Sequence, residues 1–563
     1  MASTAGAATG ANKMDLVERV SYISSTAHKD GDDYNAVKTP DIEGGALREG
    51  GAPNLFSKEA FGLLVQYAAV GLIYGTLPGT VYPFLTKYLN MEGTQTTSAS
   101  VLINLPWSFK FLYGILSDCT PLFGYRRRPW MVIGWTLSCI MLFIMAVMDP
   151  GPPYYPDPAM ADIKPEDYTP ELTAQFNEDS RDGGSKFIIL MMLAAVGYVG
   201  ADVAADAVVV EFAQREPEAV RGTTQTAIYT TRTIFVILSN VISGFFFNGY
   251  DYGGDYSFSL TFPQLMLILA IALVPVIPMT WFFIKEEKCP GVSFKSYISE
   301  FWELLQTRAM YQVVGYKFFS GCFENFVWVA AGPVASYWIG VTNLNDKLST
   351  ILANGIFAIT LWATGRWGLQ WNWRYMCIIT MLLVIGMDVI VCMLGVWDVV
   401  RSQWFWLGIP VVENIPYGVN FIISTYVVVE LAGMGNEGAV YGLVTTVSNL
   451  SQPFASTISK NINSHFRVYN LDIQEDSNEV RWDVTYTIWI MYAAKLISLL
   501  FLPLLPPQKA ETQELRRKGG KNKYMGAFTV FYVFFALCWS IMTNILSIYP
   551  STKCLRIAGG RGC

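Results

Sequence analysis

The chain has 563 residues, of which 52% are apolar and 15% are charged, and its formal net charge is −6. Soluble globular proteins usually carry about 25% charged residues, so this composition excludes an ordinary soluble domain and indicates a protein that lipid surrounds. The negative net charge gives no reason to expect binding to nucleic acid. With only two histidines and no CxxC pair, the sequence offers no recognisable metal site, and we expect no cofactor.

The first part of the chain, residues 1–56, is rich in Ala, Gly, Ser and Asp, and we expect it to form a disordered cytosolic tail. Thirteen apolar segments follow, and each is long enough to cross a bilayer as a helix, which takes about 20 residues. Their predicted ranges are 59–86, 97–117, 129–148, 186–212, 223–247, 260–284, 310–338, 347–365, 375–397, 404–431, 438–461, 483–505 and 524–549.

These segments divide into two groups of six and one extra segment. We therefore expect an all-α polytopic membrane protein, with one six-helix bundle over 57–284 and another over 310–505. A cytosolic central loop over 285–309 joins the bundles. Residues 506–563 contain a basic loop, the thirteenth segment and a tail. The thirteenth segment either spans the membrane or forms a re-entrant or interfacial helix.

The orientation follows from the loops, because cytosolic loops carry an excess of Lys and Arg. The excess falls in the loops on the side of the N-terminus, which predicts a cytosolic N-terminus. The plasma membrane is the first expectation and an organelle membrane the alternative. Cys554 and Cys563 close the C-terminal tail and could pair if that tail is not cytosolic.

An internal repeat is the most informative pattern. Residues 208–218 read VVVEFAQREPE and residues 427–437 read VVVELAGMGNE, so six of eleven positions are identical. Both stretches end an apolar segment, the fourth and the tenth. The repeat therefore relates two parallel six-helix halves, which is an architecture of transporters.

Charged residues inside the apolar segments are costly in lipid and mark a pathway or a paired network. Asp202 and Asp206 are spaced i,i+4, which places both carboxylates on one helix face. At about 1.5 Å per residue they lie roughly 15 and 9 Å from the inner end of their segment. Arg232 and Lys110 lie at similar depths, so we expect these four residues to form a central charged site. A permanent ion-pair network without a ligand is the alternative.

The second half offers fewer charges. Lys317 and Glu324 are seven residues apart and share a helix face. We interpret Lys495 as a helix-packing residue. The remaining candidates for substrate binding or coupling are Asn325, Glu413 and Asn449.

A gate on the cytosolic side is predicted between the second and third segments, in GILSDCTPLFGYRRRP. One of its arginines could pair with Asp118 in one state and release it in another. The alternative is simple anchoring by positive charge. The gate candidates are Asp118, Arg126, Arg127, Arg128, Glu211 and Glu218, with Glu430 and Glu437 at the repeated positions.

The stretches LPWSFKFLYGILSDCTPLFGYRRRPW (105–130) and GADVAADAVVVE (200–211) resemble the folate–biopterin transporter family, a branch of the major facilitator superfamily. The stretch NEGAVYGLVTTVSNLSQP (436–453) and the tail KCLRIAGGRGC (553–563) are also similar. The general superfamily motif is only partly kept, since Cys119 stands where an arginine is expected and the arginines come several residues late.

The resemblance implies a twelve-helix core, alternating access and a site between the halves near the bilayer midplane. It implies uptake of folate or pterins, coupled to protons. We also expect the protein to be a monomer. The same fold also suits a carrier of S-adenosylmethionine, whose sulfonium would prefer Asp202 or Asp206. A non-transporting membrane receptor is a further alternative. The sequence contains no catalytic motif or phosphate-binding loop, so we do not expect an enzyme.

Overall fold

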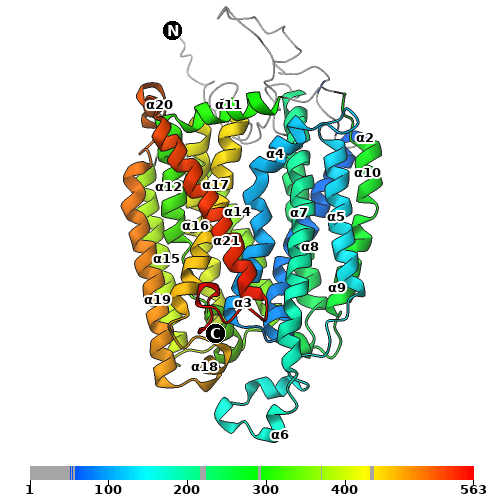
Figure 1. Ribbon diagram of the computed structural model, residues 1–563, viewed down its shortest axis with the longest axis vertical. Helices are drawn as coiled ribbons and strands as arrows, with labels where there is room; N and C mark the ends of the chain where they lie inside the picture. Colours follow the sequence, from blue (N-terminus) through cyan, green and yellow to red (C-terminus); the bar gives the residue numbers. More distant parts are fainter. Residues whose placement is uncertain are drawn as a thin grey trace, which may run out of the picture.

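The computed structural model describes residues 51, 54, 57–215, 223–288, 293–368, 371–431 and 437–563. The expected N-terminal tail, apart from residues 51 and 54, lies outside these ranges. The described chain is helical and contains no β-strand within these ranges, which confirms the all-α expectation. The helices run roughly side by side and form an upright bundle (Figure 1).

The first half of the bundle contains the helices that correspond to the first six apolar segments. Three of these segments are divided: the first into α2 and the short helical turns η2 (Pro78–Thr80) and η3 (Val81–Tyr88), the second into α3 and α4, and the sixth into α9 and α10. The bounds are α2 (Lys58–Thr76), α3 (Gly93–Asn104), α4 (Lys110–Cys119), α5 (Arg128–Val147), α7 (Glu178–Arg215), α8 (Thr223–Phe246), α9 (Phe262–Leu273) and α10 (Val276–Phe283).

The second half is built from the helices of the next six segments. Their bounds are α12 (Arg308–Glu324), α14 (Asn343–Trp367), α15 (Trp373–Val396), α16 (Gln403–Leu431), α17 (Glu437–Asn463) and α19 (Asn478–Ser498). Each half has buried apolar clusters of its own, around Tyr67 and Trp135 in the first and around Trp373 and Ile488 in the second.

The remaining helices include several short ones and one long helix near the C-terminus. The end that carries α20 is called the α20 end below, and the opposite end, which carries α18, the α18 end (Figure 1). These helices are α6 (Pro170–Thr173), α11 (Phe294–Leu305), α13 (Ala331–Pro333), α18 (Asn470–Glu475), α20 (Lys509–Lys518) and α21 (Lys523–Ile548).

Proline explains most differences from the expected continuous helices, because it lacks the N–H that continues the hydrogen-bond ladder. The second segment changes to a 3₁₀ turn, η4 (Leu105–Phe109), at Pro106. The sixth is interrupted at Pro275 between α9 and α10. The seventh ends as α12 at Glu324 and resumes near Pro333. The central loop, expected without structure, contains the helix α11.

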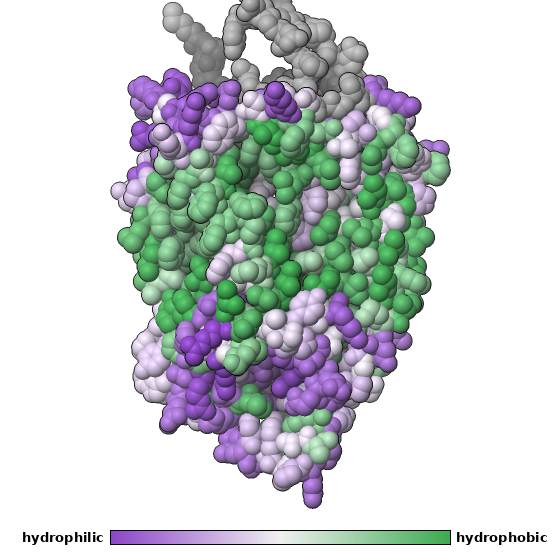
Figure 2. Space-filling model, viewed as in Figure 1, coloured by the Kyte–Doolittle hydropathy of each residue, from purple (hydrophilic) through white to green (hydrophobic). Residues whose placement is uncertain are grey.

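Eight helical stretches in the described residues are long and apolar enough to cross a membrane. They are Lys58–Tyr88, Gly93–Cys119, Arg128–Val147, Pro170–Val209, Phe262–Phe283, Trp373–Val396, Asn478–Leu504 and Lys523–Ile548. Helix α12, with 17 residues, and the apolar part of α8, Thr230–Phe246, are shorter than these stretches. Helices α14, α16 and α17 are also outside this set. A broad hydrophobic belt separates the hydrophilic ends (Figure 2), as expected for an integral, multi-pass membrane protein.

Candidate functional site

The aspartates of α7 meet one lysine of α4. The Lys110 Nζ atom lies 3.1 Å from a carboxylate oxygen of Asp202 and 3.1 Å from one of Asp206. The Asp202 side chain is fully buried, and the Tyr67 hydroxyl on α2 donates a hydrogen bond to Asp206. The i,i+4 spacing therefore does place both carboxylates on one face, where one ammonium compensates them.

Arg232 lies beside this group. Its guanidinium faces the rings of Tyr74 and Trp107, with centroid distances of 5.1 and 5.4 Å. The Lys110 ammonium also faces the Trp107 ring, at 4.7 Å. Cation–π contacts of this kind stabilise a desolvated charge. The two expected cations thus face one tryptophan, which the sequence argument did not include, and the two aspartates join this group through Lys110.

A cavity of about 490 Å³ opens among the helices of the second half. Its charged lining consists of Lys317, Glu324 and Lys495. The other lining residues are mainly hydroxyl, amide and aromatic side chains, including Tyr316, Ser320, Asn325, Phe357, Tyr417, Asn420, Phe421, Ser424, Ser448, Ser451 and Gln452. Pockets for small molecules combine such apolar walls with a few convergent polar groups.

The three charges in this cavity form no direct ion pair with one another or with any other described residue. Lys317 donates a hydrogen bond to the Ser424 hydroxyl, and Glu324 accepts one of 3.0 Å from the Asn420 amide. Within the described residues, neither Lys317, Glu324 nor Lys495 belongs to a salt bridge. The cavity therefore presents two lysines and one glutamate to an incoming molecule.

The other two candidates of the second half differ from these. Asn449 on α17 donates a 3.1 Å hydrogen bond to the Trp107 carbonyl, so it joins the second half to the first. Glu413 is 7% exposed and is not among the cavity residues. Its Oε1 atom has no hydrogen-bond partner among the described residues.

The predicted gate residues Asp118 and Arg127 form a buried ion pair of 2.6 Å. Both belong to the first half, at the ends of α4 and α5, so this pair does not itself join the two halves. The backbone N–H groups of residues 126, 127 and 128 donate hydrogen bonds to the Glu286 carboxylate at 2.7–2.9 Å. This carboxylate satisfies free donors at the start of α5.

The structure describes fewer contacts for the other predicted gate residues. The Arg128 guanidinium faces the rings of Tyr125 and Trp281. Glu218 lies outside the described residues, as do the side chains of Glu211, Glu430 and Glu437. Their part in a gate stays a prediction.

Besides Trp107, the sequence argument missed Tyr67 and Glu286, and it gave Lys495 a different role. Tyr67 and Glu286 carry no local motif that would reveal their partners. Lys495 did carry a signal, a cation inside an apolar helix, but it was interpreted as packing. The structure instead places it on the cavity wall.

The chain is similar to known folate–biopterin transporters. Residues 71–156 match the model described as the BT1 family. The "Folate-biopterin transporter" of Synechocystis sp. is 20% identical over 76% of this chain and 78% of its own length. The "Probable folate-biopterin transporter 4" of Arabidopsis thaliana is 25% identical over 31% of this chain.

The resemblance to the folate–biopterin transporter family is confirmed. The match to the first Arabidopsis relative covers 29% of that protein's length, and a second, "Probable folate-biopterin transporter 2", is matched over 18% of its length. The folate–biopterin transporter resemblance points to transporters and not to an enzyme family, as expected.

Solved structures support the fold. The D-xylose-proton symporter superposes with a TM-score of 0.53 and 14% identity, over 82% of this chain and 100% of that one. A proton dependent oligopeptide transporter gives a TM-score of 0.52 and 10% identity, over 81% and 99% of the two chains. At these identities the likeness shows the major-facilitator fold alone.

Proposed function

We propose that the protein is a secondary active transporter of folate or pterins that works by alternating access. The cavity of the second half supports this proposal most directly, because it is lined by two lysines that form no ion pair with any described residue. A buried charge without a partner is costly, and an anionic substrate would compensate these lysines. The relatives' names supply the substrate class.

Folate fits the lining better than S-adenosylmethionine. Folate combines carboxylates with a flat heteroaromatic ring, so Lys317 and Lys495 would bind the carboxylates. Phe357, Tyr417 and Phe421 would then contact the ring. A sulfonium would meet two lysines and only Glu324 as a counter-charge. The remaining alternative, a receptor that binds without transport, has the same cavity and differs only in turnover.

The charged group of the first half is proposed as the coupling site. Lys110 is shared by two carboxylates, so a proton on either aspartate would weaken that carboxylate's attraction for the ammonium. Binding of a proton would thereby change the contacts between α4 and α7. The alternative for these residues is a permanent ion-pair network. In that case the same contacts would exist, but a proton gradient would not affect transport.

The α20 end is proposed to face the cytosol, most simply at the plasma membrane. The last turn of α20 carries Arg516, Arg517 and Lys518, which agrees with the excess of positive charge in cytosolic loops. Cys554 and Cys563 form a disulfide at the opposite end, and disulfides persist in oxidising compartments.

Equilibrium binding of labelled folate to purified protein tests the cavity. We expect Lys495→Met to weaken binding by about 10- to 100-fold, the range for losing a hydrogen bond to a charged group. Lys495→Arg keeps the cation and should retain most of the affinity. Lys518→Met, on the exposed surface of α20, is the matched control.

Unchanged folate affinity in folded Lys495→Met protein would contradict the proposed site.

The Asp206→Asn variant distinguishes substrate binding from proton coupling. We expect it to bind folate but to lose stimulation of uptake by a proton gradient. Counterflow of labelled substrate in liposomes distinguishes a carrier from a receptor.

A further inference from the structure

Helix α21 lies across the boundary between the two halves. It runs diagonally from the α20 end to the α18 end (Figure 1). The Thr543 hydroxyl lies 3.0 Å from that of Thr457 on α17, in the second half. The Ser547 hydroxyl donates to the Thr94 carbonyl of α3, in the first half, at 3.4 Å. One helix outside the twelve-helix core thus contacts both halves.

A buried lysine strengthens this junction. Lys460 on α17 is fully buried. Its Nζ atom donates to the Ser98 hydroxyl of α3 at 2.6 Å and to the Asn544 side-chain carbonyl of α21 at 2.8 Å. One ammonium therefore joins the first half, the second half and α21. Its hydrogen bonds are costly to break without replacement, because the group is cut off from water.

The tail that follows α21 is closed into a ring by the disulfide between Cys554 and Cys563. On the second half, the Tyr469 hydroxyl donates to the Gly559 carbonyl at 2.9 Å. Arg561 forms an ion pair with Asp472. The tail thus holds the segment around α18.

On the first half, the same tail contacts α7. Lys553 lies 2.6 Å from a carboxylate oxygen of Asp182. Because the disulfide shortens the free chain between Lys553 and Arg561, the contacts at the two sides of the ring are mechanically linked. The ring therefore ties α7 to the α18 segment from outside.

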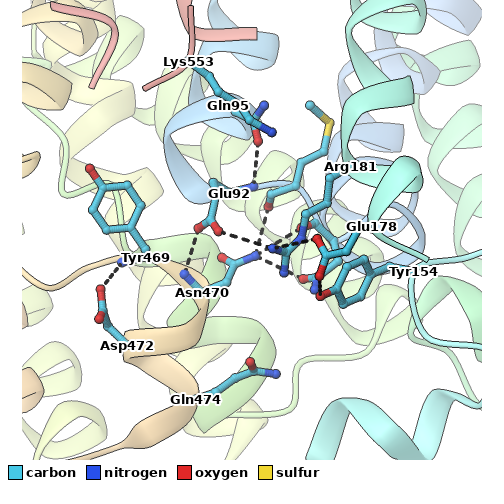
Figure 3. A network of polar contacts seen from close by, with 12 residues as sticks. Glu92, Gln95, Tyr154, Glu178, Arg181, Tyr469, Asn470, Asp472, Gln474 and Lys553 are labelled. Carbon is cyan, nitrogen blue, oxygen red and sulfur yellow. Dashed lines mark hydrogen bonds and ion pairs between the residues drawn. The ribbon is translucent and has the colours of Figure 1, made fainter. Parts of the chain in front are cut away.

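Beneath the ring, a polar network joins the same two halves directly. The backbone N–H of Asn470 donates to Glu92 at 2.8 Å, and the Asn470 amide donates to Asn90 at 3.1 Å. Figure 3 shows Glu92 between Arg181 of α7 and Asn470 of α18. The Arg181–Glu92 distance is 4.0 Å.

We propose that α21 and its disulfide-closed tail form a strap that holds the α18 ends of the two halves together. The strap contacts that cross the boundary exist only while these ends are closed, so they stabilise the closed state relative to a state open at the α18 end. This inference rests on the proposed alternating access, because only a protein that opens at this end needs such a strap.

Alkylation of a thiol introduced at position 243 tests the strap without measuring transport. Ser243 is fully buried on α8, and its carbonyl accepts a 2.9 Å hydrogen bond from Asn343 of α14 at the α18 end. In Ser243→Cys protein, a water-soluble maleimide reaches this position only when the halves separate there. Mass spectrometry of the labelled peptide gives the rate.

We expect Lys553→Asp, and separately Cys554→Ser with Cys563→Ser, to raise this rate by about two- to fivefold, as for the loss of an exposed ion pair. Adding Asp182→Lys to Lys553→Asp should restore the slow rate. Lys521→Asp is the matched control, since Lys521 pairs with Glu303 at the other end of α21, at 3.3 Å.

Unchanged rates in monodisperse strap variants would overturn the proposal, and so would a failure of the charge reversal to restore the slow rate. Liposome uptake is measured on the same preparations. Faster alkylation without any uptake would support the strap and contradict the transport proposal, so the two failures are distinguishable.

Discussion

Lys110 and Lys495 are both lysines inside apolar helices, yet their surroundings differ. Lys110 is compensated by Asp202 and Asp206 at 3.1 Å each. Lys495 lines the second-half cavity without a salt bridge to any described residue. Because an uncompensated cation in lipid is costly, the binding of an anion would stabilise the second site more than the first. This contrast is the reason for placing substrate in the second half and coupling in the first.

The Asp118–Arg127 pair gives a prediction about stability. Both side chains are at least 97% buried, and removal of one partner of such a pair costs about 3–5 kcal/mol. Arg127→Ala should therefore lower the free energy of unfolding by roughly that amount in detergent. Lys518→Ala, which removes an exposed pair with Glu514, should change it by less than about 1 kcal/mol. A stable Arg127→Ala protein with altered transport would instead favour the gate.

Asp476 gives a prediction about pH. Burial acts to raise the pKa of Asp476, but hydrogen bonds from Arg401 and Arg481 outweigh it and hold the pKa below its ordinary value of 3.8. A lowered carboxyl pKa stabilises the fold above the ordinary value, and this contribution is lost as pH falls through the folded-state pKa. Asp476→Asn should therefore lower the melting temperature at pH 7.

The same comparison below about pH 4 should give a smaller difference between Asp476→Asn and the parent. The control is Glu514→Gln, which affects an exposed pair on α20. An equal difference in melting temperature at both pH values would contradict the assigned role of the carboxylate.

At the scale of helices, the close contact of α2 with α8 depends on glycine. A Cβ atom on Gly71 would collide with the backbone carbonyl of Arg232, and one on Gly75 would lie 2.6 Å from the Ser239 hydroxyl oxygen. Small residues of this kind let membrane helices approach closely. The α2–α8 contact also fixes the position of Arg232 beside Trp107.

Gly71→Ala should therefore force α2 away from α8 and destabilise the protein by about 1–3 kcal/mol, as overpacking typically does. Gly386→Ala on α15 is the matched control, because a Cβ there meets no atom within 4 Å. Thermal unfolding in the same detergent compares them. Equal melting temperatures would show that α2 and α8 can separate at little cost.

Local spacing in the sequence was sufficient to predict some features of these helices. The i,i+4 spacing of Asp202 and Asp206 predicted a shared face, and one lysine contacts both residues. The cavity could not be predicted in this way, because the side of α19 that carries Lys495 depends on how α19 is rotated against α12 and α15. By contrast, α11 lies in a segment expected to be a loop, although Phe294, Tyr297, Ile298 and Phe301 recur at the i, i+3, i+4, i+7 spacing of an amphipathic helix. That signal was in the sequence and was missed.

At the scale of the whole molecule, the major-facilitator fold provides two halves that meet at several places. The Asn449–Trp107 hydrogen bond joins them near the charged group. The Asn343–Phe247 and Asn470–Asn90 contacts join them at the α18 end. The proposed alternating access would require some of these contacts to break in each cycle, so under that proposal they belong to the state that is closed at the α18 end.

Uptake by purified protein in liposomes tests the central claim most directly. Labelled folate, biopterin and S-adenosylmethionine are compared with and without an inward proton gradient, in the parent protein and in Lys495→Met. The account predicts uptake of folate or biopterin that the gradient stimulates and that Lys495→Met lowers at least tenfold. Uptake of S-adenosylmethionine alone, or specific binding of folate without uptake of any of the three, would contradict it.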